Sequence, residues 1–221
     1  MMKRSILIIA LLSCIVTTGV TVRAQDIKTF RFGLYGGPNL STMTVDFDHK
    51  SRIGYQVGIV AEVNPVEFCY INAAVSYIQK GVVFKDGRIS ALGDKYDVTA
   101  TPGYVQVSPH LGLRAVISEG FSIFGEFGPF WAYGVTGRLK DKDGSNRNKI
   151  DYFSSDGETY LGAKPNRLDY GLSGAVGVEI GNGCKLGVSY DHGLKKAFSH
   201  DNPVLKDGKT RSLTLQITVM M

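Results

Sequence analysis

The feature of this sequence that most constrains its fold is a strict alternation of apolar and polar residues over long runs. It is clearest between Gly103 and Thr136, where two such runs flank Ser118, Glu119 and Gly120. A period of two predicts β-strands with one apolar face and one polar face. Each run has about ten residues or more, which is the length that a tilted strand needs to cross a bilayer.

The same alternation recurs along the chain and predicts eight strands, at residues 30–43, 52–63, 69–79, 103–117, 121–136, 168–180, 185–190 and 212–219. The pattern of the third run blurs after Gln79, as at a β-bulge. Tight turns are expected at 64–67, 118–120 and 181–183, and longer loops at 46–51, 85–101, 140–166 and 195–209. Short and long connections therefore alternate, which is typical of bacterial outer-membrane barrels. The expected fold is all-β, an eight-stranded antiparallel up-and-down transmembrane β-barrel.

Glycine indicates which face of the strands points outward. A soluble lipocalin-like barrel, the alternative, would bury the apolar face and expose the polar one. Eight glycines share the polar face: Gly33, Gly37, Gly58, Gly112, Gly128, Gly171, Gly177 and Gly187. Glycine weakens a strand and gains nothing on a solvated surface, but small residues are useful inside a narrow eight-stranded barrel. We therefore expect a side-chain-filled interior that carries the polar face and an apolar wall that faces lipid.

The first residues resemble an export signal, with Lys3 and Arg4 before an apolar stretch and Val22-Arg23-Ala24 as a cleavage site. We expect residues 1–24 to be a cleaved signal peptide and residues 25–221 to form one outer-membrane barrel domain. Leu11-Leu12-Ser13-Cys14 also resembles a lipobox, which would instead place a lipid on Cys14.

Charge and cysteine content exclude several classes of protein. The chain has 25 Lys and Arg against 20 Asp and Glu, and cleavage would remove three basic residues. The balance that remains does not suggest a nucleic-acid partner. Cys69 and Cys184 lie on apolar faces of distant strands, so no disulfide is expected. No motif for a cofactor is found.

Several short motifs resemble a known family. These are 32–41 (FGLYGGPNLS), 54–58 (GYQVG) with Glu62, 77–81 (YIQKG), 128–130 (GPF), 169–172 (DYGL) and 177–179 (GVE). In this order they are similar to the PorT-like outer-membrane β-barrel family of Bacteroidetes. The resemblance implies an eight-stranded barrel in a Gram-negative outer membrane, and the namesake of the family belongs to a secretion and gliding system. The chain departs from the usual aromatic last residue of such barrels, since it ends with Met220 and Met221.

The expected interior contains many polar and charged residues, which we predict to form a network: Arg31, Glu62, Gln106, His110, Arg114, Glu126, Asp169, Glu179 and Lys185. Charges inside a narrow barrel must be paired, because an isolated buried ion is costly. The favoured interpretation is that the paired charges fill and close the lumen, and the alternative is that they form a gate or a proton path. A three-residue turn at 181–183 places Glu179 opposite Lys185, which predicts a direct ion pair.

Three other groups of residues are candidate sites. Ser108 and His110 share the inward face, as in a hydrolase, but residues two apart along a strand are roughly 7 Å apart and the chain has no Gly-x-Ser-x-Gly motif. Asp191-His192 and His200-Asp201 flank the last loop, where solvated side chains are expected and a metal site is the alternative. The basic segment 138–149 would face lipopolysaccharide or solvent. We expect no catalytic, cofactor or metal site.

The sequence therefore favours a monomeric outer-membrane barrel without an open pore, acting as a structural or interaction module linked to secretion or cell-surface processes. Its expected partners are outer-membrane lipid and lipopolysaccharide, and another envelope protein through the loops. The alternatives are a periplasmic lipocalin-like ligand-binding barrel and an outer-membrane lipid-modifying enzyme.

Overall fold

The described part of the chain consists almost entirely of long antiparallel strands. The computed structural model describes residues 30–44, 49–84, 98–141, 150–161, 163–181, 183–198 and 208–221. The signal peptide expected at 1–24 and Cys14 lie outside these ranges. The strands are β1 (Phe30–Thr44), β2 (His49–Val66), β3 (Cys69–Gln79), β4 (Val82–Phe84), β5 (Val98–Ser118), β6 (Phe121–Asp141), β7 (Leu168–Ile180), β8 (Cys184–Lys196) and β9 (Lys209–Met220).

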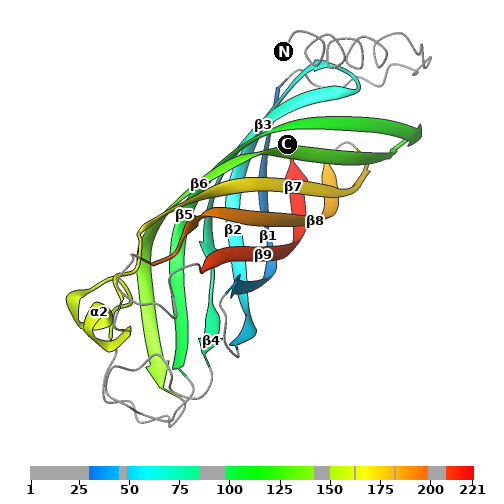
Figure 1. The fold of residues 1–221 in the computed structure, drawn as a ribbon. Helices are drawn as coiled ribbons and strands as arrows, with labels where there is room; N and C mark the ends of the chain where they lie inside the picture. The colour runs from blue at the N-terminus through cyan, green and yellow to red at the C-terminus, as the bar shows by residue number, and fades with distance from the viewer. Residues whose placement is uncertain are drawn as a thin grey trace, which may run out of the picture.

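The strands close into a barrel (Figure 1). Each strand pairs antiparallel with its neighbour, and β1 pairs with both β2 and β9, which closes the ring. The short strand β4 pairs with β2 and β5, the same neighbours as β3, and follows it after Lys80 and Gly81. β3 and β4 are therefore one barrel strand with an interruption, where the alternation was expected to blur. The predicted eight-stranded antiparallel barrel is confirmed.

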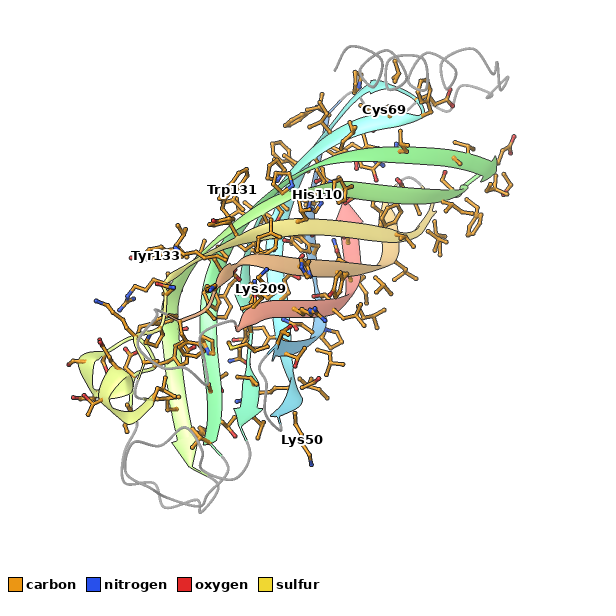
Figure 2. All side chains as sticks on the ribbon, in the orientation of Figure 1. Lys50, Cys69, His110, Trp131, Tyr133 and Lys209 are labelled. Atoms are coloured by element: carbon orange, nitrogen blue, oxygen red, sulfur yellow. The ribbon has the colours of Figure 1, made fainter. Side chains whose placement is uncertain are left out.

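The apolar face of the strands points outward and the polar face inward. Phe32 is 56% exposed and Ile53 is 73% exposed, whereas the Glu62 side chain is fully buried. Figure 2 shows Trp131 and Tyr133 projecting outward from β6. A surface of this kind is stable only where lipid covers it, and a closed barrel leaves no unpaired strand edge in the lipid.

Glycines inside the barrel make room for aromatic rings. A Cβ atom added at Gly112 would overlap the ring of Tyr70, and one at Gly177 would lie 2.8 Å from the ring of Phe124. A Cβ at Gly171 would meet the ring of Phe130 at 2.8 Å. Interior rings therefore pack on these three glycines of the polar face, in agreement with the narrow interior of an eight-stranded barrel.

The tight turns lie at the end of the barrel that carries the C-terminus. Gly120 and Gly181 have φ of 77° and 64°, a left-handed conformation that glycine adopts without strain. The first turn was predicted at 64–67, and this position is wrong by a few residues. β2 continues through Pro65 at a bulge, where no ladder donor is needed, and the turn is formed by Glu67 and Phe68.

The opposite end is uneven, because β5 and β6 have 21 residues each and project beyond the other strands (Figure 1). Both strands are longer than the alternation predicted, since the residues of β5 before Gln106 are nearly all buried and lose the period of two. The long segment after β6 also contains a helix that the sequence did not predict, α2 (Ser155–Leu161), whose start is capped by the Ser154 hydroxyl accepting from Gly157 N–H. None of the described helical residues form a helix long and apolar enough to cross a bilayer.

Candidate functional site

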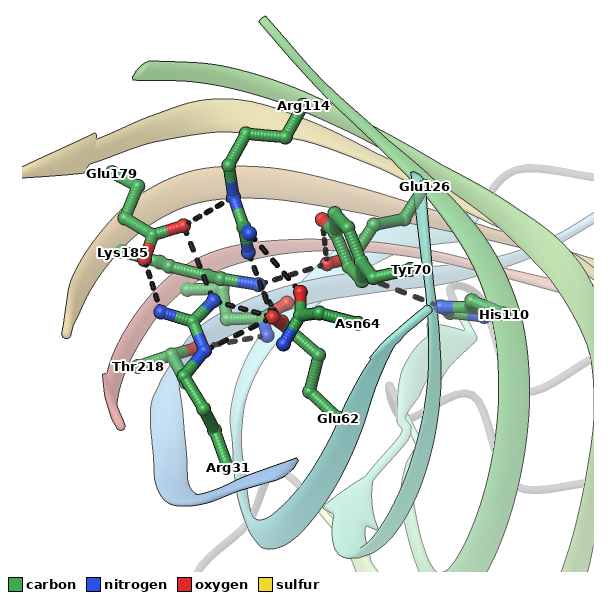
Figure 3. A network of polar contacts seen from close by, with 11 residues as sticks. Arg31, Glu62, Asn64, Tyr70, His110, Arg114, Glu126, Glu179, Lys185 and Thr218 are labelled. Atoms are coloured by element: carbon green, nitrogen blue, oxygen red, sulfur yellow. Dashed lines mark hydrogen bonds and ion pairs between the residues drawn. The ribbon is translucent and has the colours of Figure 1, made fainter. Parts of the chain in front are cut away.

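The lumen near the tight turns is filled by a charge network centred on Glu62 (Figure 3). The Glu62 carboxylate accepts hydrogen bonds from the Arg31 guanidinium, from Arg114 Nη2 at 2.7 Å and from Lys185 Nζ at 2.5 Å. These cations come from β1, β5 and β8, so one carboxylate of β2 joins strands on different sides of the barrel. A buried carboxylate with three cationic donors is fully compensated.

Glu179 forms the second centre of the network. Its carboxylate lies 2.5 Å from Arg31 Nη1 and 2.9 Å from Arg114 Nε. The turn at 181–183 does place Glu179 opposite Lys185 in the ladder, as predicted. The predicted ion pair between Glu179 and Lys185 is not formed. Lys185 instead reaches across the lumen to Glu62 and Glu126. A long lysine side chain can cross a narrow lumen, which strand register alone does not reveal.

Glu126 joins this network to the aromatic rings. It accepts a hydrogen bond from the Tyr70 hydroxyl at 2.7 Å and lies 3.6 Å from His110 Nδ1. Lys185 Nζ and Arg114 Cζ lie 4.4 and 4.7 Å from the centre of the Tyr70 ring, within cation–π range. The fully buried Tyr70 side chain therefore contacts two cations and one carboxylate of the network.

The middle of the lumen contains a small polar cavity of about 40 Å³. Gln106 donates to Asp191 at 2.9 Å, and the Ser173 hydroxyl donates to the same carboxylate at 2.6 Å. Three buried polar atoms of the lining have no partner in the described structure: Asn72 Oδ1, Gln106 Oε1 and His110 Nε2. A polar cavity of this size has room for a few water molecules, which would satisfy these atoms.

Above the cavity, a buried ion pair lies beneath an apolar cluster. Lys80 Nζ is 3.0 Å from Asp169 Oδ2, which also accepts from Thr210, and the ammonium lies 4.5 Å from the centre of the Phe130 ring. Residues of four strands, of α2 and of the flanking segments then form the outer apolar cluster: Met43, Val82, Val98, Ala100, Leu139, Tyr152, Leu161, Ala163 and Phe198.

Tyr152 shows how dry this cluster is. Its side chain is buried, and burial, with the nearby negative charge of Asp169, raises the pKa of the Tyr152 hydroxyl well above its ordinary value. The lumen is thus occupied along its length by charges, amides and hydroxyls, an ion pair and finally apolar side chains.

The structure places all nine predicted interior residues inside the barrel, but not in one network. Seven meet near the tight turns: Arg31, Glu62, His110, Arg114, Glu126, Glu179 and Lys185. Gln106 lies in the middle level and Asp169 in the outer one. The predicted network did not include Tyr70 and Asp191, although both have inward parity. It also did not include Lys80, which follows the point where the alternation blurs.

The other candidate sites separate in space. The Ser108 hydroxyl accepts from Gln106 at 3.2 Å while His110 faces Glu126, so their polar contacts run to different partners. Asp191 is buried in the lumen, whereas His192 lies on the opposite face, with its ring centre 6.4 Å from that of Tyr190. His200 and Asp201 lie outside the described residues, as does most of the segment 138–149. Across the described ranges, no group of three or more His, Cys, Asp or Glu side chains is arranged to hold a metal ion.

Three solved structures show similarity to this fold at low sequence identity. Ail of Yersinia pestis is 12% identical, with 88% of this chain and 100% of that chain covered and a TM-score of 0.45. OprG of Pseudomonas aeruginosa is 13% identical, with 90% and 99% covered and a TM-score of 0.47. Neisserial surface protein A is 11% identical, with 87% and 97% covered and a TM-score of 0.42. Among curated proteins, none matches the chain.

The sequence itself matches the family described as "Outer membrane protein beta-barrel domain" over residues 23–199, which is most of the chain. This match and the exposed apolar wall exclude the alternative of a soluble, lipocalin-like barrel. The chain therefore belongs to the outer membrane protein β-barrel domain family, and it is a protein of the Gram-negative outer membrane.

Proposed function

We propose that this protein is a closed outer-membrane barrel that acts as a structural or interaction module and conducts no solute. The observation that carries the proposal is the occupied lumen. The network around Glu62 fills the end near the tight turns, and the outer apolar cluster covers the other end. Water-filled channels belong to barrels of about sixteen strands, whereas eight strands leave room only for side chains.

The uneven outer end supports a role in contacts rather than in transport. β5 and β6 extend well past the twelve residues of β9, and they carry α2 outside the ring (Figure 1). Strand ends that project from a membrane-anchored scaffold and lead into loops are suited to present a binding surface, because loops on a scaffold commonly carry function. The partner proposed is another envelope protein.

The resemblance to PorT-like barrels extends this proposal to secretion or cell-surface processes. The contacts inside the lumen favour a role without catalysis, because its charged residues form ion pairs and hydrogen bonds with one another. Glu62, Glu179 and Glu126 are each bound by cations or hydroxyls of the barrel wall. An acid–base catalyst would need such a group within reach of a substrate.

Conductance measurements test the closed lumen. The purified, folded barrel is inserted into planar lipid bilayers, and a sixteen-stranded porin serves as the positive control. We expect no discrete conductance steps from the barrel under conditions where the porin opens. Reproducible steps that scale with the amount of folded barrel would overturn the proposal.

Crosslinking tests the interaction surface. A photoactivatable residue is placed at Glu158 on the exposed side of α2, and a matched one at Glu119 in a tight turn at the other end. We expect one defined envelope protein to crosslink at position 158 and not at 119 in living cells. Absence of any crosslink at 158, in cells where the barrel is assembled, would contradict a partner at this end.

A further inference from the structure

The outer wall has an apolar groove where the first and last strands meet. The groove has a volume of about 310 Å³ and is lined by Pro38, Asn39, Leu40, Ile53, Val188, Leu213 and Leu215. All of these except Asn39 are apolar, and Leu40, Ile53, Leu213 and Leu215 are exposed on the outer face. The groove therefore opens toward the lipid and not toward the lumen.

The groove lies at a break in the ladder between β1 and β9. Pairing runs to Gly36 opposite Ile217 and resumes only at Asn39 opposite Thr214. Pro38 falls in this gap, and proline has no N–H to donate to the ladder. The seam of the barrel, where β1 pairs with β9, therefore has an interrupted ladder beneath the groove of the lipid-facing wall.

Basic side chains lie directly beyond the groove on the same outward stripe. Along β9, Arg211 and Lys209 have the same parity as Leu213 and Leu215, and each step of two residues is roughly 7 Å. Arg211 lies opposite Thr42 of β1 and Lys209 opposite Lys196 of β8. Figure 2 shows Lys209 at the start of β9, the end away from the tight turns.

Within the described part of the chain, nothing neutralises this basic pair. Among the described residues, neither Lys209 nor Arg211 has a carboxylate partner. Cations at the end of a lipid-facing apolar stripe match an amphiphile with an anionic head group and acyl chains. Arginine and lysine are the side chains that bind phosphate most strongly, as charge-assisted donors.

We propose that this groove and the basic pair form a binding site for lipid A, the phosphorylated and acylated glycolipid of the outer leaflet. One acyl chain lies in the groove at the seam, and a phosphate lies against Arg211 and Lys209. The leaflet follows from topology, because the tight turns of such barrels face the periplasm and the loop end faces outward. Tyr190, exposed beside Leu213 in the ladder, adds an aromatic side chain of the kind enriched where barrels meet the membrane interface.

The test measures the binding of fluorescent lipid A to the folded barrel in detergent micelles. The variant Lys209→Gln/Arg211→Gln is compared with Arg138→Gln/Lys140→Gln, which removes two exposed charges from β6. One basic residue near a membrane surface contributes roughly fivefold in affinity, so we expect the first variant to bind at least tenfold more weakly. The β6 variant should bind as the wild type does.

A second pair of variants tests the groove. Val188→Trp fills it with a larger side chain on the lipid face, and Val107→Trp makes the same change on the exposed wall of β5. We expect weaker lipid A binding for Val188→Trp alone, with competition by unlabelled lipid A and none by inorganic phosphate at equal concentration. Equal binding by all four variants, equal loss in both members of a pair, or full competition by inorganic phosphate or phosphatidylglycerol would overturn the site.

Discussion

Replacing Glu62 by Gln is expected to destabilise the barrel more than any single exposed charge change. Three cations, those of Arg31, Arg114 and Lys185, meet three carboxylates in the network, and Glu62 contacts all three cations. Glu62→Gln keeps the side-chain volume, so it creates no cavity, but it leaves one positive charge in excess in a buried site. Removing one partner of a buried ion pair costs about 3–5 kcal/mol. This is a large fraction of the roughly 5–15 kcal/mol that stabilises a typical domain.

A second substitution should restore the balance of charge. Lys185→Met in the background of Glu62→Gln removes the excess positive charge, and an apolar replacement of a buried pair is often close to neutral. We expect the double variant to recover about 2 kcal/mol or more of the loss. Glu119→Gln, in an exposed turn, is the matched control and should lie within about 0.5 kcal/mol of the wild type.

The assay is equilibrium unfolding in urea from lipid vesicles, followed by the emission of Trp131, the single tryptophan of the chain. The reasoning fails if Glu62→Gln unfolds at the same urea concentration as Glu119→Gln. It also fails if Glu62 and Lys185 show no coupling energy in the double-mutant cycle. Charged groups 2.5 Å apart should be coupled, so independence would mean that they are not partners.

Further changes test the packing and the topology. Gly112→Ala places a Cβ against the ring of Tyr70 and should cost about 1–3 kcal/mol in the same urea assay, whereas Gly125→Ala, which meets nothing within 4 Å, should be nearly neutral; equal costs would contradict the packing of the ring. With the native cysteines replaced by serine, Glu158→Cys should react with an impermeant maleimide on intact cells and Glu119→Cys only after lysis. The reverse order of labelling would invert the barrel in the membrane.

Alternation and glycine placement predicted most of the architecture, because each strand must separate a lipid face from a lumen face. The turn at 181–183 also gave the correct register of Glu179 and Lys185. The partners within the lumen were not predictable in the same way. A side chain as long as that of Lys185 can reach any of several strands, so its contact with Glu62 depends on the curvature of the closed ring.

Two other features escaped prediction for local reasons. The bulge near Pro65 moves the first turn toward the C-terminus. Proline interrupts the hydrogen bonding between β2 and β3, but the strand continues to Val66. The outer part of β5 loses its alternation because its residues pack on both sides. Val98 and Ala100 belong to the apolar cluster that contains Tyr152 and Leu161, and Thr101 on the other face accepts a hydrogen bond from Arg52. Tyr152 and Phe198, which close the outer end, come from segments that the sequence presented only as polar loops.

The central claim is that the apolar face contacts lipid while the lumen is closed to it, and fluorescence quenching by brominated acyl chains tests this most directly. Trp131 is exposed on the outer wall, whereas its neighbour Phe130 is fully buried in the lumen. In vesicles of brominated lipid, we expect strong quenching of Trp131 in the wild type and weak quenching in Phe130→Trp/Trp131→Phe, once this variant is shown to fold by faster migration of the unheated protein on a mild-detergent gel. Equal quenching of the two tryptophans, or stronger quenching at position 130, would contradict the account.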